Sequence, residues 1–317
     1  MKDKILVTGA AGFIGSHLCE NLISIGKKVI GLDNFDDFYD TSIKKNNLTS
    51  LKKSSNFTFY EIDIAQKKEV FSVKEDFNTV IHIAAKAGVR PSVESPLKYI
   101  DTNINGTQNI LDLMNQKNCK KILFASSSSV YGNNKNTPFK ETHSVSNAIS
   151  PYAFTKKANE VQIHTYHHLY NINAICFRFF TVYGPRQRPD LAIHKFFKKI
   201  LNNETISLYG DGSTKRDYTY INDLVDGIIK GLNYLNEKKS LYEIINLGNS
   251  HPISLIEMVE TIYNELRKEK NIEFLPMQMG DVDITHADIT KAKKLINYNP
   301  KTTFKEGVAK FAEWYKN

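Results

Sequence analysis

Residues 4–15 read KILVTGAAGFIG, a short apolar run followed by glycines at positions 9, 12 and 15. The apolar run predicts a buried β-strand, and the spacing that follows predicts a helix over about 13–24. Glycines between a strand and a helix permit a tight turn, a close approach of backbone N–H groups to a pyrophosphate, and close packing of the helix on the sheet. The helix N-terminus also attracts an anion. We therefore predict a dinucleotide-binding turn whose contacts are Gly9, Gly12, Phe13, Ile14 and Gly15.

An acidic residue ends the second predicted strand. The run KKVIGLD closes on Asp33, and Asn34 follows it. A carboxylate at this place accepts hydrogen bonds from ribose hydroxyls and repels a 2′-phosphate. The sequence therefore favours NAD over NADP as the cofactor, with Asp33 and Asn34 among its contacts.

Strand-like and helix-like stretches alternate along the first half of the chain. Further strands are predicted at FTFYEID, TVIHIAA, KKILFAS and INAICFRF. This alternation is typical of α/β proteins, and it predicts a Rossmann-type doubly wound parallel sheet with helices on both faces. After about residue 184 the elements become shorter, and they include ISLYGDG and YEIINLG. We interpret 1–184 as the NAD-binding domain and 185–317 mainly as a smaller C-terminal α/β lobe for substrate, with an interleaved boundary.

The composition excludes several classes of protein. The net charge of +8 comes with lysines spread along the whole length, which indicates a solvated surface and not a nucleic-acid site. Three cysteines match neither a disulfide framework nor a zinc spacing and favour a reducing compartment. No apolar run approaches the length of a transmembrane helix, and the first one is too short for a signal peptide. We expect a cytoplasmic protein with no membrane or nucleic-acid partner.

Several stretches resemble the extended short-chain dehydrogenase/reductase family in the right order. The spacing G-x-x-G-x-x-G is the first of them, and DTNINGT, SSSSVYG and a Tyr-x-x-x-Lys pair follow. The resemblance implies that Asp63 and Ile64 contact adenine and that Asn103 is structural. It also implies that Ala84, Ala85 and Lys86 lie beneath the pyrophosphate and ribose.

The resemblance assigns catalysis to Ser127, Tyr152 and Lys156. Tyr152 and Lys156 are four residues apart in the helix-like stretch ISPYAFTKKANE, so they lie one turn apart on one face. A phenol has a pKa near 10, and we expect the lysine and the nicotinamide ring to lower it, so that Tyr152 acts as the base and Lys156 also holds the ribose. Ser127 bridges the tyrosine and the substrate hydroxyl, with Ser128 and Ser129 beside it as alternatives.

The residues missing from the serine-rich segment indicate the reaction. Dehydratases of the extended family carry an Asp–Glu pair there, and UDP-glucuronate decarboxylases carry a glutamate near position 129. This chain has no acid between residues 126 and 132. Without a second acid–base group, a 4-keto sugar has reduction as its remaining fate. The resemblance therefore implies NAD-dependent C4 epimerisation of a UDP-sugar, with a decarboxylase, a dehydratase and a non-catalytic or RNA-associated NAD-binding protein as alternatives.

The segment RFFTVYGPRQRPD resembles that of UDP-glucuronate 4-epimerases. Arginine is scarce in this chain, and its planar fork suits a carboxylate or a phosphate. We expect Arg188 to pair with a C6 carboxylate and Arg216 to hold the diphosphate. UDP-glucuronate is thus favoured over UDP-glucose, UDP-galactose and N-acetylated sugars. The predicted substrate contacts are Arg90, Ser127, Ser128, Thr181, Arg186, Arg188, Tyr209, Arg216, Gln278 and Asp281.

Two further predictions concern metals and assembly. The histidines at positions 164, 167 and 168 have helical spacing but no accompanying carboxylates, so we expect no metal site. The family commonly forms homodimers through two helices of the nucleotide-binding domain. Here these are 96–116 and 152–169, and we expect a homodimer.

Overall fold

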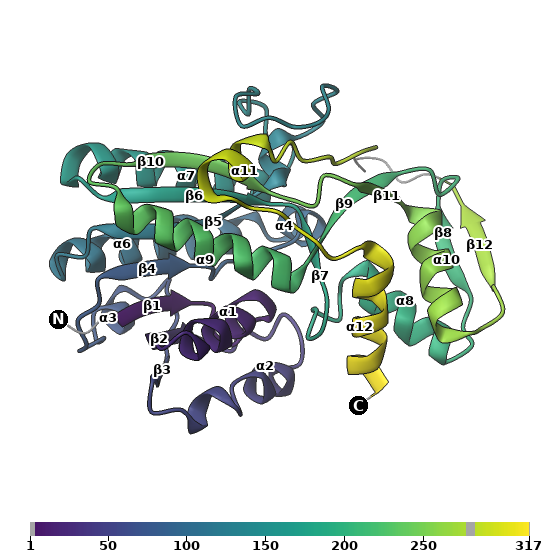
Figure 1. Cartoon of the computed structure of the whole chain (residues 1–317), viewed down its shortest axis with the longest axis horizontal. Coiled ribbons are helices and arrows are strands. Elements are labelled where there is room, and N and C mark those ends of the chain that lie inside the picture. Colours follow the sequence, from purple (N-terminus) through teal and green to yellow (C-terminus); the bar gives the residue numbers. More distant parts are fainter. Residues whose placement is uncertain (1–3, 277–282, 317) are drawn as a thin grey trace.

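The computed structural model of the chain describes residues 4–276 and 283–316. Its largest element is a seven-stranded parallel sheet with the order β10-β6-β5-β4-β1-β2-β3 (Figure 1). The prediction of a Rossmann-type doubly wound sheet is confirmed. The strands are β1 Lys4–Thr8, β2 Lys28–Asp33, β3 Phe57–Glu61, β4 Thr79–His82, β5 Lys121–Ser127, β6 Asn173–Phe179 and β10 Tyr242–Leu247.

Helices cover both faces of this sheet, as the alternation of buried side chains along its strands requires. Ile5 and Val7 of β1 belong to the core under α1 and α9, whereas Leu6 belongs to the core under α3, α6 and α7. The helices of this layer are α1 Phe13–Ser24, α2 Thr41–Asn47, α3 Lys67–Val70, α4 Val89–Glu94, α5 Pro96–Tyr99, α6 Gly106–Gln116, α7 Pro151–Tyr170 and α9 Ile221–Glu237.

The strand order reverses at β1, which lies between β4 and β2. In open parallel sheets, ligands bind at the carboxyl ends of the strands where the order reverses. The loops that follow β1, β2, β4 and β5 carry the glycine turn, Asp33, the 84–86 segment and the serine-rich segment. The topology therefore brings these sequence-distant motifs to one edge.

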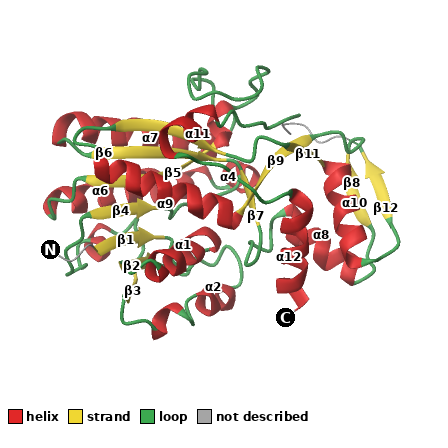
Figure 2. Ribbon diagram, in the orientation of Figure 1, coloured by secondary structure: helices red, strands yellow, loops and turns green. Residues whose placement is uncertain are grey.

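A smaller lobe stands beside the large sheet, at the right of Figures 1 and 2. It holds a three-stranded sheet, β11-β9-β7, and a two-stranded sheet, β12-β8, with α8, α10 and α12 packed against them. The bounds are β7 Thr181–Tyr183, β8 Ile206–Tyr209, β9 Lys215–Tyr220, β11 Pro252–Ser254, β12 Ile272–Leu275, α8 Ala192–Leu201, α10 Leu255–Leu266 and α12 Phe304–Lys316. The helix α11 Thr290–Ile296 packs instead against α9 and β10 of the large sheet. Short 3₁₀ turns lie at Leu51–Lys53 and Ser128–Tyr131.

The chain crosses between the two lobes more than once. YEIINLG, which the sequence analysis assigned to the smaller lobe, instead forms β10 and pairs in parallel with β6. About forty residues, which belong mainly to the smaller lobe, separate β6 from the crossover helix α9. Because of this insertion, the β6–α9–β10 unit is not recognisable from the spacing of elements in the sequence. The strand β7, by contrast, precedes residue 184 and pairs with β9 of the smaller lobe.

The predicted helix over 96–116 is divided into three parts. A π-helical segment, η2 (Ile100–Asn105), separates α5 from α6. Its Asn103 side chain accepts a hydrogen bond from the Lys86 N–H at 2.8 Å and donates to the Lys86 carbonyl and the Thr155 hydroxyl, each at 3.0 Å. Asn103 thereby fixes the loop after β4 against helix α7.

A buried ion pair joins β6 to α7. The Glu160 and Arg178 side chains are each 1% exposed, and the Arg178 guanidinium donates from Nε and Nη2 to the two carboxylate oxygens at 2.9 Å. The Ser126 hydroxyl, at the end of β5, donates to the same carboxylate at 2.7 Å. The pair therefore ties β5, β6 and α7 together directly behind the carboxyl edge of the sheet.

Removing one charge of this pair is expected to destabilise the fold strongly. Glu160→Gln leaves the Arg178 charge buried without its counter-ion, which costs about 3–5 kcal/mol of unfolding free energy. Urea denaturation measures this loss. The matched control is Glu243→Gln, whose partly exposed pair with Lys291 should contribute under about 1 kcal/mol. Equal losses in the two variants would contradict the importance of the buried pair.

Candidate active site

The glycine turn between β1 and α1 is shaped by contacts that exclude a side chain. A Cβ atom at Gly15 would lie 1.9 Å from the Gly9 carbonyl oxygen. Gly9 has φ +71°, and a Cβ there would lie 2.9 Å from the Ala84 nitrogen. The N-cap residue of α1 is Gly12, which makes no side-chain capping hydrogen bond. The first turn of α1 therefore presents its backbone N–H groups to the carboxyl edge of the sheet, as an anion site requires.

Asp33 lies at the end of β2 with its carboxylate buried. Its two oxygens accept hydrogen bonds from the Ala11 N–H at 3.1 Å and the Phe35 N–H at 2.9 Å. Burial raises the pKa of Asp33, and the nearby Lys44 ammonium offsets part of that rise. The loop after Asp33 is closed over the edge by an ion pair of 2.7 Å between Asp36 and Lys86.

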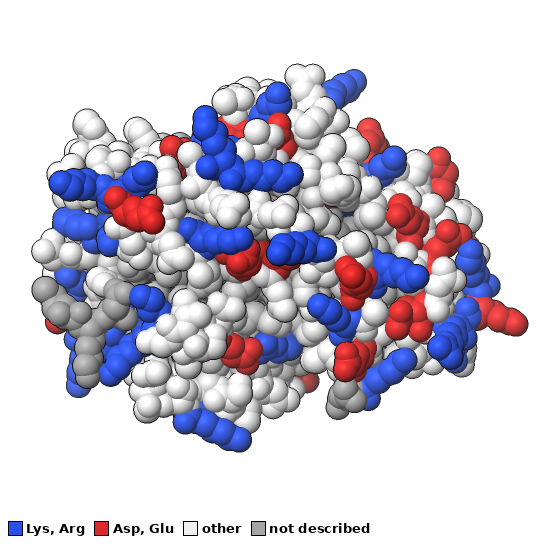
Figure 3. Space-filling view, viewed as in Figure 1, with Lys and Arg blue, Asp and Glu red and all other residues white. Residues whose placement is uncertain are grey.

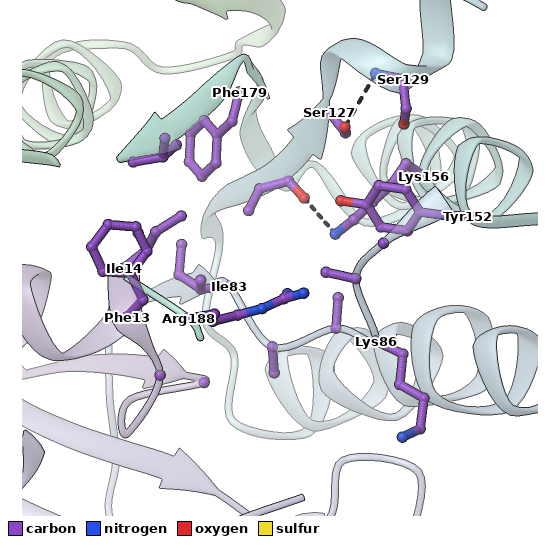
Figure 4. A pocket seen from close by; sticks show the side chains of 18 of the residues that line it. Phe13, Ile14, Ile83, Lys86, Ser127, Ser129, Tyr152, Lys156, Phe179 and Arg188 are labelled. Atoms are coloured by element: carbon purple, nitrogen blue, oxygen red, sulfur yellow. Dashed lines mark hydrogen bonds between the residues drawn. The ribbon is translucent and has the colours of Figure 1, made fainter. Parts of the chain in front are cut away.

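A serine and a proline set the start of the helix that carries Tyr152. The Ser150 side chain accepts a hydrogen bond from the Ala153 N–H at 3.1 Å, and Pro151 occupies the first helical position. Tyr152 and Lys156 then project from one face of α7 into a common pocket, as Figure 4 shows. The expected geometry of the pair is present.

Ser127 is the last residue of β5, and its hydroxyl lies within hydrogen-bonding reach of Tyr152. Its oxygen accepts a hydrogen bond from the Ser129 N–H at 3.1 Å, so the hydroxyl proton remains available to donate. Burial raises the pKa of Tyr152, and the Ser127 hydrogen bond and then the Arg188 charge act against that rise. The phenol ring also packs edge-on against Tyr99, with ring centroids 6.3 Å apart.

The expectation that Lys156 lowers the pKa of Tyr152 is not met by the chain itself. The Lys156 ammonium donates to the Ala125 carbonyl at 2.6 Å and lies 6.0 Å from the centre of the Tyr152 ring. Burial lowers the pKa of Lys156 to about 7, so the group carries only part of a charge at neutral pH. Arg188 is the cation of the chain that lowers the pKa of Tyr152.

These motifs line one cavity of about 810 Å³. This volume lies in the upper part of the range for small-molecule sites, roughly 300–1,000 Å³. The wall of the cavity includes most of the predicted contacts. They are Gly9, Gly12, Phe13, Ile14, Gly15, Asp33, Asn34, Asp63, Ile64, Ala84, Ala85, Lys86, Arg90, Ser127, Ser128, Tyr152, Lys156, Thr181, Arg188 and Arg216.

The structure does not bring Arg186 and Tyr209 to the wall of this cavity. Arg186 instead binds Glu20 of α1 through both carboxylate oxygens, at 3.0 and 2.6 Å. Tyr209, in β8, is 36% exposed outside the cavity. The predicted contacts Gln278 and Asp281 lie outside the described residues.

The wall also includes residues that were not predicted as contacts, among them Lys44 and Phe38. Lys44 lies in the lysine-rich helix α2 and donates to the Asp36 carbonyl at 2.7 Å, and Phe38 lies beneath Arg188. Ser129 is different, because its hydroxyl is buried, lacks a hydrogen-bond partner among the described residues and belongs to the serine run. The run SSSS identified that group as polar, but position in the fold was needed to place it in the cavity.

The chain's own groups fit NAD. The glycine cradle that a Cβ would fill, the uncapped start of α1 and the Asp33 carboxylate are the features that a pyrophosphate and a ribose diol require. Gly9, Gly12 and Gly15 would hold the pyrophosphate, Asp33 the adenosine ribose, and Lys156 the nicotinamide ribose. Among the described residues, no three His, Cys, Asp or Glu side chains are grouped to hold a metal ion.

A protein-family model described as GDP-mannose 4,6 dehydratase matches residues 6–311 of this chain. The chain belongs to this family. The resemblance to the extended short-chain dehydrogenases/reductases is confirmed by it.

Proteins similar to this chain over nearly their whole length are named as epimerases. The UDP-glucuronate 4-epimerase of Thermodesulfobacterium geofontis is 45% identical over 314 residues, which cover 98% of this chain and 95% of that protein. The crystal structure of UDP-glucuronic acid 4-epimerase from Bacillus cereus with UDP-glucuronic acid and NAD covers 99% of both chains, at 34% identity and a TM-score of 0.90. A UDP-N-acetylglucosamine 4-epimerase from Methanobrevibacter ruminantium is 31% identical, with a TM-score of 0.89 and coverage of 100% and 99%.

The buried ammonium of Lys156 gives a pH-dependent contribution to stability. Its pKa falls from 10.5 in the unfolded chain to about 7 in the folded one. Between these values the unfolded chain binds more protons, so the free energy of unfolding rises as the pH increases from about 7 towards 10.5. The stability gained by Lys156→Met should therefore be largest below pH 7 and shrink as the pH rises.

Urea denaturation of nucleotide-free protein between pH 6 and pH 9 measures this difference. The matched control is Lys305→Met, the same substitution at an exposed position on α12, and its difference from wild type is subtracted at each pH. A remaining difference for Lys156→Met that is constant with pH would contradict the lowered pKa of Lys156.

Proposed function

We propose that this protein is an NAD-dependent UDP-sugar 4-epimerase that interconverts UDP-glucuronate and UDP-galacturonate. The observation that carries this proposal is the presence of Tyr152, Ser127 and Arg188 in one cavity with the glycine turn. The serines at positions 126–129 leave this part of the wall without a carboxylate. The epimerases named above, from three organisms, support the reaction class.

The chain's own residues divide the proton chemistry between them. Ser127 donates a hydrogen bond that orients Tyr152 and the O4 atom of the sugar, and the Tyr152 oxygen accepts the O4 proton and later returns it. Lys156, anchored on the Ala125 carbonyl, has two remaining N–H donors for ribose hydroxyls. When bound, NAD supplies the hydride acceptor and donor for ring C4. The absence of an acid from the serine-rich segment leaves the 4-keto sugar without a built-in route to dehydration.

The cationic group that favours a uronate is Arg188. Its guanidinium reaches into the middle of the pocket in Figure 4, and it stacks on the Phe38 ring at 5.1 Å. A planar guanidinium suits a C6 carboxylate, whereas a hydroxymethyl group gives no charge-assisted hydrogen bond. An N-acetylated or neutral UDP-sugar is the alternative substrate, since the Methanobrevibacter relative is a UDP-N-acetylglucosamine 4-epimerase.

Tyr152→Phe is expected to lower kcat about 10²–10⁴-fold, because it removes the group that moves the O4 proton. Retained NAD, measured after denaturing the protein, shows that the cofactor site is intact. Turnover at the wild-type rate would exclude Tyr152 as the base.

Arg188→Ala is expected to weaken UDP-glucuronate binding about 10–100-fold through loss of a charge-assisted hydrogen bond, and to change UDP binding much less. Product analysis with a panel of UDP-sugars and titration calorimetry test this expectation. Turnover of UDP-glucose with no turnover of UDP-glucuronate would contradict the proposed substrate.

We also propose that two copies associate through α4, α5 and α7, which contact one another in the structure. Large apolar side chains are exposed there, and Val93, Leu97 and Val161 are 63%, 77% and 53% exposed. Clustered exposed apolar side chains mark interaction surfaces. On the face in Figure 3, basic and acidic side chains are interspersed.

We place the reaction in the cytoplasm. The three cysteine thiols at positions 19, 119 and 176 are buried and free, as a reducing compartment permits. No helix within residues 4–276 and 283–316 has the length and apolar character to cross a bilayer.

The pair of changes Leu97→Glu and Val161→Glu should convert the dimer to a monomer while the folded chain persists, because four charges would then meet in the interface. Light scattering gives the mass, and thermal unfolding gives the stability. Ile25→Glu is the matched control. Ile25 is an exposed apolar residue too, at 50%, but it lies at the end of α1, away from the proposed interface. An unchanged mass in the double variant would place the dimer interface elsewhere.

A further inference from the structure

A carboxylate of the chain already occupies one edge of the Arg188 guanidinium. Arg188 Nε donates to Asp190 Oδ1 at 2.9 Å, and Nη2 donates to Oδ2 at 2.6 Å. The two side chains are 18% and 31% exposed, so the pair is only partly screened by water. Asp190 was not among the residues that the sequence analysis singled out.

The local sequence makes this pair a rigid unit. Pro189 separates Arg188 from Asp190, and its ring fixes one backbone angle and restricts the residue before it. The flat face of the guanidinium lies over the Phe38 ring at 5.1 Å. The Arg188 fork is therefore held from its side by a carboxylate and across its face by an aromatic ring.

The segment that carries this pair is itself anchored. Two residues earlier, Arg186 has φ +65° and binds Glu20 through both carboxylate oxygens. Gln187 is buried and donates from Nε2 to the Val182 carbonyl at 3.1 Å. Arg188 consequently enters the cavity from a fixed backbone, and its direction does not depend on Asp190 alone.

The hydrogen bonds that Arg188 makes within the described residues use the N–H of Nε and one N–H of Nη2, so both N–H groups of Nη1 and the second one of Nη2 remain for a ligand. The Asp190 charge also cancels much of the guanidinium charge at the distance of a ligand. Burial lowers the pKa of Arg188, but the hydrogen bonds and charge of Asp190 outweigh this and leave that pKa above its ordinary value. The cavity thus offers an incoming anion a neutralised fork with one open edge.

We propose that Asp190 is a specificity-determining residue that limits how tightly Arg188 holds the carboxylate of a uronate substrate. The proposal rests on the proposed function. Inversion at C4 inside one fixed site requires the sugar ring to turn over, and a carboxylate locked on a fully charged, bidentate guanidinium opposes that turn. Asp190 neutralises part of the guanidinium charge, which keeps the carboxylate contact weak enough to be exchanged.

Asp190→Asn tests the proposal because it removes the charge and retains an oxygen that accepts from Arg188 Nε. Binding of UDP-glucuronate and of UDP-glucose is measured by titration calorimetry on NAD-loaded Tyr152→Phe protein, where turnover does not interfere. The ratio of the two Kd values should shift about tenfold towards UDP-glucuronate, since one nearby countercharge is removed. In protein that keeps Tyr152, Asp190→Asn should lower both KM and kcat for UDP-glucuronate. Both fall because the bound substrate is held more tightly before the reaction.

Asp226→Asn is the matched control, because it makes the same change in an ion pair with Lys230 on α9 that lies outside the cavity, and it should leave the Kd ratio within about twofold of the parent protein. Asp190→Ala removes both the charge and the oxygen that accepts from Arg188 Nε. The difference between Asp190→Ala and Asp190→Asn therefore measures how much that oxygen orients Arg188. A Kd ratio that Asp190→Asn leaves unchanged or moves towards UDP-glucose overturns the proposal, because Asp190 then only holds Arg188 in place. Failure of the wild-type protein to convert UDP-glucuronate is a separate result that overturns the proposed function, and the binding ratio is obtained without it.

Discussion

The backbone at Gly9 and Gly15 approaches so closely that a methyl group on Gly15 would overlap the Gly9 carbonyl oxygen. This contact sets the distance of α1 from the sheet, and so places the free N–H groups of its first turn at the point where the strand order reverses. Gly9 also touches the backbone of Ala84 after β4, on the other side of the switch point. The cavity is therefore formed by backbone packing at the crossover, and the side chains that line it are added to a shape already fixed.

A second constraint keeps the reacting side chains in register. Glu160 is one turn beyond Lys156 on α7, and Ser126 is next to Ser127 on β5, so the buried carboxylate joins the two elements that carry the proposed catalytic groups. A charge inside the protein is costly unless it is paired and hydrogen-bonded, and here Arg178 and Ser126 meet that requirement. Breaking this pair would thus affect more than stability, because the Ser127–Tyr152 geometry depends on the same contacts.

The sequence was sufficient where function depends on local backbone. The glycine turn and the i, i+4 pair on α7 are specified by neighbouring residues, and the structure has both of them. It was insufficient where the partner is distant. Arg186 and Arg188 are two residues apart in one motif, yet Arg186 turns to Glu20, 166 positions away, while Arg188 enters the cavity. The left-handed backbone conformation of Arg186 turns its side chain away from that of Arg188. No residue type in the motif predicts this conformation.

The electrostatics of Tyr152 show why the chain alone does not make a reactive base. Burial raises the pKa of the phenol and lowers that of Lys156, so the two groups that the motif pairs move towards neutrality together. Among the described residues, Arg188 is the cation that counters the rise, and Asp190 cancels part of its charge. In the proposed reaction, the positive charge of a bound nicotinamide ring would add to the stabilisation of a phenolate. The acidity of Tyr152 would then depend on occupancy of the site, so that proton abstraction would be favoured when a hydride acceptor is present.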